Sequence, residues 1–139
     1  MKKFQKKLNF NHFLDEKGWK LYDYQKAFLK NLETDKFRSF LIFSDTGTGK
    51  TITTFLPIIL DKLNGLDKKI IYVAPLKSLI TDIHKNLIEL LARFNLKITV
   101  EKRTGDESYS FKNKQLFNQP DILLTTPESL ALLMTKKES

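Results

Sequence analysis

The sequence contains no cysteine, so disulfide bonds, thiolate metal sites and cysteine nucleophiles are excluded. It also lacks a long uninterrupted apolar run. The segments 55–60 and 76–91 are either short or broken by charged and polar residues, so neither predicts a membrane span. The basic start, residues 1–7, is not followed by the apolar core and small-residue cleavage site of a secretory signal. Together these absences predict a cytoplasmic protein that does not span a membrane.

What is present is sufficient for one folded domain. The chain has 139 residues, of which 41% are hydrophobic, and this is enough to bury a core. The 24 lysines and arginines outnumber the 16 aspartates and glutamates, which leaves a formal charge of +8. Such a surplus favours a polyanionic partner such as nucleic acid. A lysine-rich proteome explains the same surplus equally well, so charge alone leaves both interpretations open.

Apolar periodicity alternates between two kinds of segment along the chain. Strands are predicted at 40–43, 69–74, 97–100 and 121–125. Helices are predicted at 24–32, 50–63, 76–94 and from 126 onwards, with a turn at 104–106 and a short helix or loop at 107–119. This order predicts an α/β fold, in which a parallel sheet carries helices on both faces. Ligands of such sheets bind at the carboxyl ends of the strands.

Residues 44–51 read Ser-Asp-Thr-Gly-Thr-Gly-Lys-Thr between a predicted strand and a predicted helix. A triphosphate needs several backbone N–H groups around its oxygens, and glycines at 47 and 49 let the backbone wrap that closely. Ser44 stands where the strict P-loop pattern has glycine, and the alternative is a turn with an incidental lysine. The P-loop interpretation predicts ATP and Mg²⁺ as ligands, with Lys50 on the β- and γ-phosphates and the Thr51 hydroxyl on Mg²⁺. The candidate nucleotide contacts in the loop are Asp45, Thr46, Gly47, Thr48, Gly49, Lys50 and Thr51, of which Lys50 and Thr51 are the candidate catalytic residues.

The Ser-Asp-Thr-Gly-Thr-Gly-Lys-Thr form resembles motif I of superfamily-two helicases and translocases, the DEAD/DEAH-box group in the broad sense. Further segments resemble that family's motifs in the same order: 24–25 the Q motif, 73–79 motif Ia, 103–106 the Thr-Gly-Asp element and 125–130 motif Ib. The run 121–134 is particularly similar to the large-helicase-related and Ski2-like branches. Taken singly, Gln25 also fits a solvated residue, residues 74–75 fit the end of a strand, and residues 126–127 fit a helix cap. Their shared order favours the family, over roughly residues 22 to 134.

The resemblance implies a RecA-like P-loop NTPase fold, with a partial first RecA-like domain at 22–139 after a basic extension at 1–21. It also implies that Gln25 reads adenine through its amide. A single strand of nucleic acid is expected to bind through its phosphates, independently of sequence and sensitively to salt. The implied contacts are Pro75, Lys77, Arg103, Thr104, Gly105, Thr126, Pro127 and Glu128. For Lys77 and Arg103, ordinary surface charge is the alternative.

The family's motif II, Asp-Glu-x-His or a relative, is absent from this sequence. Its acids hold Mg²⁺ and orient the attacking water, and neither Glu101 nor Asp121 has the position to replace them. The second RecA-like domain is absent as well. We therefore expect part of an ATP-dependent DNA or RNA helicase or translocase, incomplete at the C-terminus, that binds nucleotide weakly and hydrolyses it negligibly alone.

Two alternatives remain open at the level of sequence. The first is another P-loop translocase, of the restriction type, since such enzymes share the superfamily; the motif Ia and Ib segments disfavour an AAA+ protein. The second is a non-catalytic module that binds nucleotide or nucleic acid.

Overall fold

The computed structural model describes residues 14–15, 17–34 and 39–135. They form two compact units, which divide between Leu66 and Asp67, and each unit is described by itself. Most of the predicted basic extension lies outside the described residues. In the part of the chain that the structure describes, none of the helices combines the length and the hydropathy that crossing a membrane requires.

The N-terminal unit contains helices α2 (Asp23–Thr34) and α3 (Lys50–Leu63). The prediction for α3 is confirmed at both ends, and the helix continues through Pro57. One hydrophobic cluster of this unit also includes residues that precede the expected domain start at residue 22. Its members are Leu14, Leu21 and Leu56, with Trp19, Leu29 and Ile52 partly buried against them. The folded unit therefore includes residues from the predicted extension.

Residues 40–43 do not form the predicted strand. Phe40 packs edge-on against Phe28, with ring centroids 5.2 Å apart, but Leu41 and Phe43 are 81% and 84% exposed. A strand requires a neighbour for its backbone N–H and C=O groups, and the described residues of the N-terminal unit contain no strand. The strand predicted from the apolar run was therefore wrong.

The C-terminal unit is built on a parallel sheet of β1 (Ile70–Val73), β2 (Val100–Arg103) and β3 (Ile122–Thr125), in the order β1-β3-β2. The register aligns Ile70, Ile122 and Val100 across the three strands. Helices α4 (Lys77–Arg93), α5 (Tyr109–Phe117) and α6 (Pro127–Thr135) follow the strands in turn. The α/β alternation of this unit is thus confirmed.

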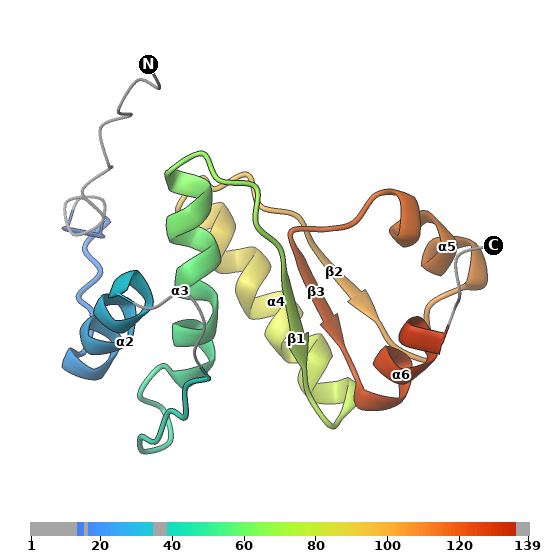
Figure 1. Ribbon diagram of the computed structural model, residues 1–139, viewed down its shortest axis with the longest axis horizontal. Helices are drawn as coiled ribbons and strands as arrows, with labels where there is room; N and C mark the ends of the chain where they lie inside the picture. The colour runs from blue at the N-terminus through green and yellow to red at the C-terminus, as the bar shows by residue number, and fades with distance from the viewer. Residues whose placement is uncertain (1–13, 16, 35–38, 136–139) are drawn as a thin grey trace. The chain divides into compact units, whose positions relative to one another are not determined.

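The strand order determines which faces the helices cover. The chain passes from β1 over β3 to β2 and then returns to β3, so right-handed crossovers place α4 and α5 on opposite faces. Figure 1 shows α4 on one side of this sheet and α5 and α6 on the other. The buried side of α4 consists of Ile80, Ile83, Leu87 and Leu91. Leu76 and Leu79, which belong to the same periodic stripe in the sequence, are 62% and 40% exposed because they lie at the start of the helix, where the sheet ends.

Strand β2 lies at 100–103, three residues later than the 97–100 predicted from apolarity. Its sequence, Val-Glu-Lys-Arg, is mostly charged, which a strand at the edge of a sheet tolerates. Thr99 donates two hydrogen bonds to the carboxylate of Asp121, one from its backbone N–H (2.8 Å) and one from its hydroxyl (2.9 Å). These bonds hold the residue that precedes β2 next to the start of β3. Pairing with β3 rather than local hydrophobicity therefore sets the register.

Candidate nucleotide and nucleic-acid sites

The phosphate loop leads directly into α3. Gly47 and Gly49 have φ angles of 78° and 81°, in the left-handed region that glycine adopts without steric cost, and Gly49 is the N-cap of α3. This geometry leaves the first backbone N–H groups of a 14-residue helix without intrahelical partners, at its positive end. The loop therefore has the backbone form that binds a phosphate.

The two glycines allow a matched prediction. A Cβ atom at Gly49 would lie 3.2 Å from Nε2 of Gln25, whereas one at Gly47 would meet nothing within 4 Å. Both Gly→Ala variants incur the left-handed penalty of about 1–2 kcal/mol, and Gly49→Ala adds the clash. We expect Gly49→Ala to lower the free energy of unfolding, measured by urea denaturation, further than Gly47→Ala does. Equal losses would contradict the described packing of Gln25 on Gly49.

Lys50 is folded back onto the loop. Its ammonium group donates to the carbonyl oxygens of Ser44 and of Asp45, the latter at 2.6 Å. The Ser44 and Thr48 hydroxyls are 2.7 Å apart, and Thr48 also donates to the Asp45 carbonyl. Ser44, in the position of the pattern's first glycine, thus braces the loop through its hydroxyl. Thr51 is exposed in the first turn of α3.

Gln25 and Tyr24 brace the loop from α2. Gln25 is 1% exposed; its amide oxygen accepts from the backbone N–H of Tyr22 (3.0 Å), and its amide nitrogen donates to the Thr53 hydroxyl (2.9 Å). The hydroxyl of Tyr24 donates to the Thr48 carbonyl (2.6 Å). The amide of Gln25 is therefore engaged within the protein, and adenine reading by Gln25 stays a prediction.

Tyr24 and Thr53 were not among the predicted site residues. Tyr24 lies in the segment that resembles the Q motif but was interpreted only as an apolar helical position, and Thr53 is one of several threonines after the loop. Only the approach of α2 to the start of α3 reveals their role, because the hydroxyl of Thr53 donates to the carbonyl of Gly49 (2.9 Å) and lies 3.1 Å from that of Tyr24.

The predicted nucleic-acid contacts lie at or just beyond the carboxyl ends of the three strands, as expected for a parallel sheet. The structure divides them by exposure. The exposed members are Pro75, Lys77, Gly105, Pro127 and Glu128, and the buried members are Arg103, Thr104 and Thr126. The exposed residues occupy the starts of α4 and α6 and the turn after β2. They therefore form the accessible part of the predicted contact surface.

Arg103 is 4% exposed and is bound to α5. One guanidinium nitrogen, Nη1, donates to the carbonyl of Lys112 (2.8 Å) and to the side-chain oxygen of Gln115 (3.1 Å). Burial lowers the pKa of Arg103, and the charge of Glu107 offsets part of this effect. Arg103 is therefore not ordinary surface charge, and its contact with a phosphate stays a prediction. It connects β2 to α5.

Thr104 is held by Glu107. The carboxylate of Glu107 accepts from both the backbone N–H and the hydroxyl of Thr104, the latter at 2.8 Å. Burial opposes ionisation of Glu107, but these hydrogen bonds, together with the backbone N–H of Glu107 and the charge of Lys102, lower the pKa of the carboxyl. Next to this turn, Lys77 and Asp106 form an ion pair with a distance of 2.6 Å between Nζ and Oδ1. The Thr-Gly-Asp turn is therefore ordered by the two acids that follow Gly105, Asp106 and Glu107.

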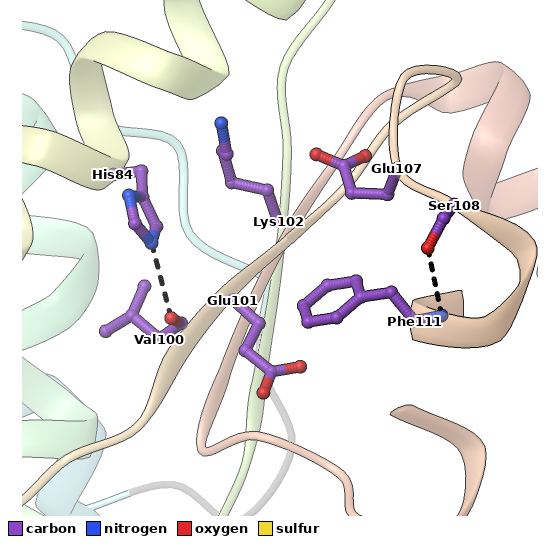
Figure 2. Close-up of a pocket in the computed structure, with 7 residues that line it drawn as sticks. All are labelled: His84, Val100, Glu101, Lys102, Glu107, Ser108 and Phe111. Carbon is purple, nitrogen blue, oxygen red and sulfur yellow. Dashed lines mark hydrogen bonds between the residues drawn. The ribbon is translucent and has the colours of Figure 1, made fainter. Parts of the chain in front are cut away.

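A hollow of about 340 Å³ lies along the free edge of β2 and is lined from α4, β2 and the start of α5 (Figure 2). In it, His84 Nε2 lies 3.3 Å from the carbonyl oxygen of Val100. Glu101 Oε2 is buried with no hydrogen-bond partner among the described residues. Glu101 is the second residue of its strand, not the last, so its position differs from that of a motif II acid. Within the described ranges, no three His, Asp or Glu side chains come together as metal ligands.

Comparison with known proteins shows the family of this chain. The family model for the DEAD/DEAH box helicase matches residues 22–139. The chain belongs to the DEAD/DEAH box helicase family. Among the relatives of this helicase chain, the ATP-dependent helicase Lhr-Core of Sulfolobus acidocaldarius is 41% identical over 110 residues, which are 70% of this chain and 13% of that protein. The Lhr helicase/uracil glycosylase of Escherichia coli is 36% identical over 121 residues, which are 70% of this chain and 8% of that protein.

Solved structures of helicases also resemble this chain. The helicase Lhr of Mycobacterium smegmatis, bound to ssDNA and AMP-PNP, matches 90% of this chain and 17% of its own with a TM-score of 0.70 and 31% identity. The DUF1998 helicase MrfA, bound to DNA and AMPPNP, matches 84% of this chain with a TM-score of 0.70 and 24% identity, which supports the fold alone. The RecA-like helicase fold predicted from the sequence is thus confirmed. This helicase chain spans less than a fifth of the length of each of these proteins.

Proposed function

We propose that this chain supplies the ATP-binding loop and part of the nucleic-acid surface of an ATP-dependent helicase or translocase. The observation that carries the proposal is the loop itself, in which two left-handed glycines lead into α3 with Lys50 and Thr51 in its first turn. Residues 22–139 would then be the first part of a RecA-like ATP-binding domain. The relatives, which are far longer than this chain, support that assignment.

The nucleotide site follows from the loop geometry. Lys50 would exchange the carbonyl oxygens of Ser44 and Asp45 for the β- and γ-phosphates, because charged oxygens are the stronger acceptors. Thr51, exposed beside it, would give one ligand to Mg²⁺, while the phosphates and water supply the others, as is usual for this ion. Bound ATP would supply the phosphoanhydride whose hydrolysis drives movement, and Mg²⁺ would offset the charge of its phosphates. Since the sequence has no Asp-Glu-x-His segment, we expect negligible hydrolysis by this chain alone.

The nucleic-acid site follows from the ends of the three strands. Lys77 and Gly105 are exposed, and the first turn of α6 after Pro127 has backbone N–H groups that lack intrahelical partners. Such groups bind phosphate oxygens without contacting base edges, so binding would be independent of sequence. The solved Lhr helicase contains ssDNA, which supports a single strand as the ligand. DNA and RNA both present the required phosphates.

Lys77→Ala tests this surface against Lys85→Ala, which removes an exposed lysine from the same helix. We expect Lys77→Ala to weaken binding of a fluorescent oligothymidylate about tenfold at low salt and to reduce the salt slope by about one phosphate contact. Lys85→Ala should change either quantity much less. Fluorescence anisotropy over a salt series measures both. Equal effects of the two substitutions would contradict a defined contact at Lys77.

A further inference from the structure

The Lys77–Asp106 ion pair joins parts of the sheet that are not neighbours. Lys77 begins α4, directly after β1, while Asp106 lies in the turn after β2, and β3 separates the two strands. The 2.6 Å contact between Nζ and Oδ1 therefore spans the carboxyl end of β3, where the predicted phosphate contacts at 126–128 begin. Both side chains are largely exposed, so the pair lies on the surface that nucleic acid is proposed to occupy.

The side chain of Lys77 passes close to Gly105 on its way to Asp106. A Cβ atom at this position would lie 3.2 Å from Nζ and 3.5 Å from Cε of Lys77. The positive-φ glycines of the described chain are Gly18, Gly47, Gly49 and Gly65, so backbone conformation does not require glycine at 105. A second lysine, Lys112, donates to the Gly105 carbonyl at 3.3 Å. The absence of a side chain at Gly105 therefore leaves space for a lysine.

Both acidic and basic side chains surround the turn at Gly105. The hydrogen bond and the charge of Asp106 raise the pKa of Lys77, with smaller contributions from Glu107 and Glu128. The hydrogen bond from Lys77 lowers the pKa of Asp106, and the charges of Lys77, Lys112 and Lys102 act in the same direction. Glu107 is bound to Thr104, whereas among the described residues Lys77 is the side chain that donates to the carboxylate of Asp106. Asp106 is therefore the acid that can move away without breaking other contacts.

We propose that Asp106 is an internal substitute for a nucleic-acid phosphate: it occupies Lys77 in the free chain, and a backbone phosphate must displace it to bind. The inference rests on the proposed function and identifies a residue that sets the affinity of that site. An ammonium group exchanges one anion for another, and no covalent step is involved. Asp106 thus lowers the affinity for the strand and keeps Lys77 extended over Gly105 when no strand is present.

A double-mutant cycle in the 139-residue chain tests this. Asp106→Asn removes the competing charge, Lys77→Met removes the contested ammonium group, and Asp82→Asn, on the exposed side of α4, is the control for net charge. We expect Asp106→Asn to tighten binding of a fluorescent oligothymidylate about three- to tenfold at low salt, beyond the change caused by Asp82→Asn. In the Lys77→Met background, the two Asp→Asn substitutions should have the same effect.

An NMR titration of the Asp106 carboxyl group tests the same inference independently of affinity. The pKa of Asp106 should rise towards its ordinary value in Lys77→Met, and also when the oligonucleotide is added to the unsubstituted chain. If oligothymidylate binds but Asp106→Asn matches Asp82→Asn, or weakens binding, the inference is wrong while the proposed function stands. If neither the unsubstituted chain nor Asp106→Asn binds at low salt, both are wrong for this chain.

Discussion

Replacing Lys50 by alanine is expected to weaken binding of a fluorescent ATP analogue by about ten- to a hundredfold. The ammonium group is the only side-chain cation of the loop, and a hydrogen bond between charged groups contributes about 1.5–3 kcal/mol. In the free chain Lys50 satisfies two loop carbonyls, Ser44 and Asp45, so binding exchanges these contacts rather than creating them from water. Fluorescence anisotropy with and without Mg²⁺ measures the loss.

Lys30→Ala is the matched control, because it removes an exposed lysine from α2 in the same unit. It should leave nucleotide affinity nearly unchanged. Urea denaturation of all three chains shows whether each variant is still folded, so that a loss of nucleotide affinity in a folded Lys50→Ala chain can be assigned to the lost ammonium group. Comparable nucleotide affinity in Lys50→Ala and Lys30→Ala would exclude the loop as the phosphate site.

Replacing Gln25 by alanine is expected to lower both stability and nucleotide affinity. Its buried amide satisfies the backbone N–H of Tyr22 and the hydroxyl of Thr53, and its nitrogen lies 3.5 Å from the carbonyl of Gly49. The change removes the hydrogen bonds of a fully buried side chain, while the Thr53 hydroxyl keeps its contacts with Gly49 and Tyr24, so we expect the free energy of unfolding to fall by roughly 1–3 kcal/mol. Urea denaturation measures this, with the exposed Gln119→Ala as control.

The same variant separates two roles for Gln25. If the amide braces the loop, Gln25→Ala should weaken ATP and GTP analogues by the same factor, because both carry the same phosphates. If the amide reads adenine, the variant should lose ATP affinity alone, with stability close to that of the unsubstituted chain. A selective loss with unchanged stability would therefore overturn the bracing role that the hydrogen bonds indicate.

Local patterns were sufficient for the phosphate loop and the elements around the predicted surface. The start of α3 at Lys50 follows from the glycines before it, and the start of α6 at Pro127 follows from a residue that suits the first helical turn. Each of these helix starts depends on a few adjacent residues, so it can be predicted from the sequence alone. The alternation of strands and helices from residue 69 onwards likewise predicted the parallel sheet.

Contacts between distant residues decided the rest. Apolarity at 40–43 could not show whether a neighbouring strand would pair with that segment, and the charges of Val-Glu-Lys-Arg concealed a strand whose register depends on β3. The sequence by itself determined the phosphate loop, the family and the order of the elements, because these depend on short segments. Only the tertiary structure decided that Arg103 is buried, that Gln25 braces Gly49 and that Lys77 holds Asp106, because each of these depends on which remote side chain arrives beside it.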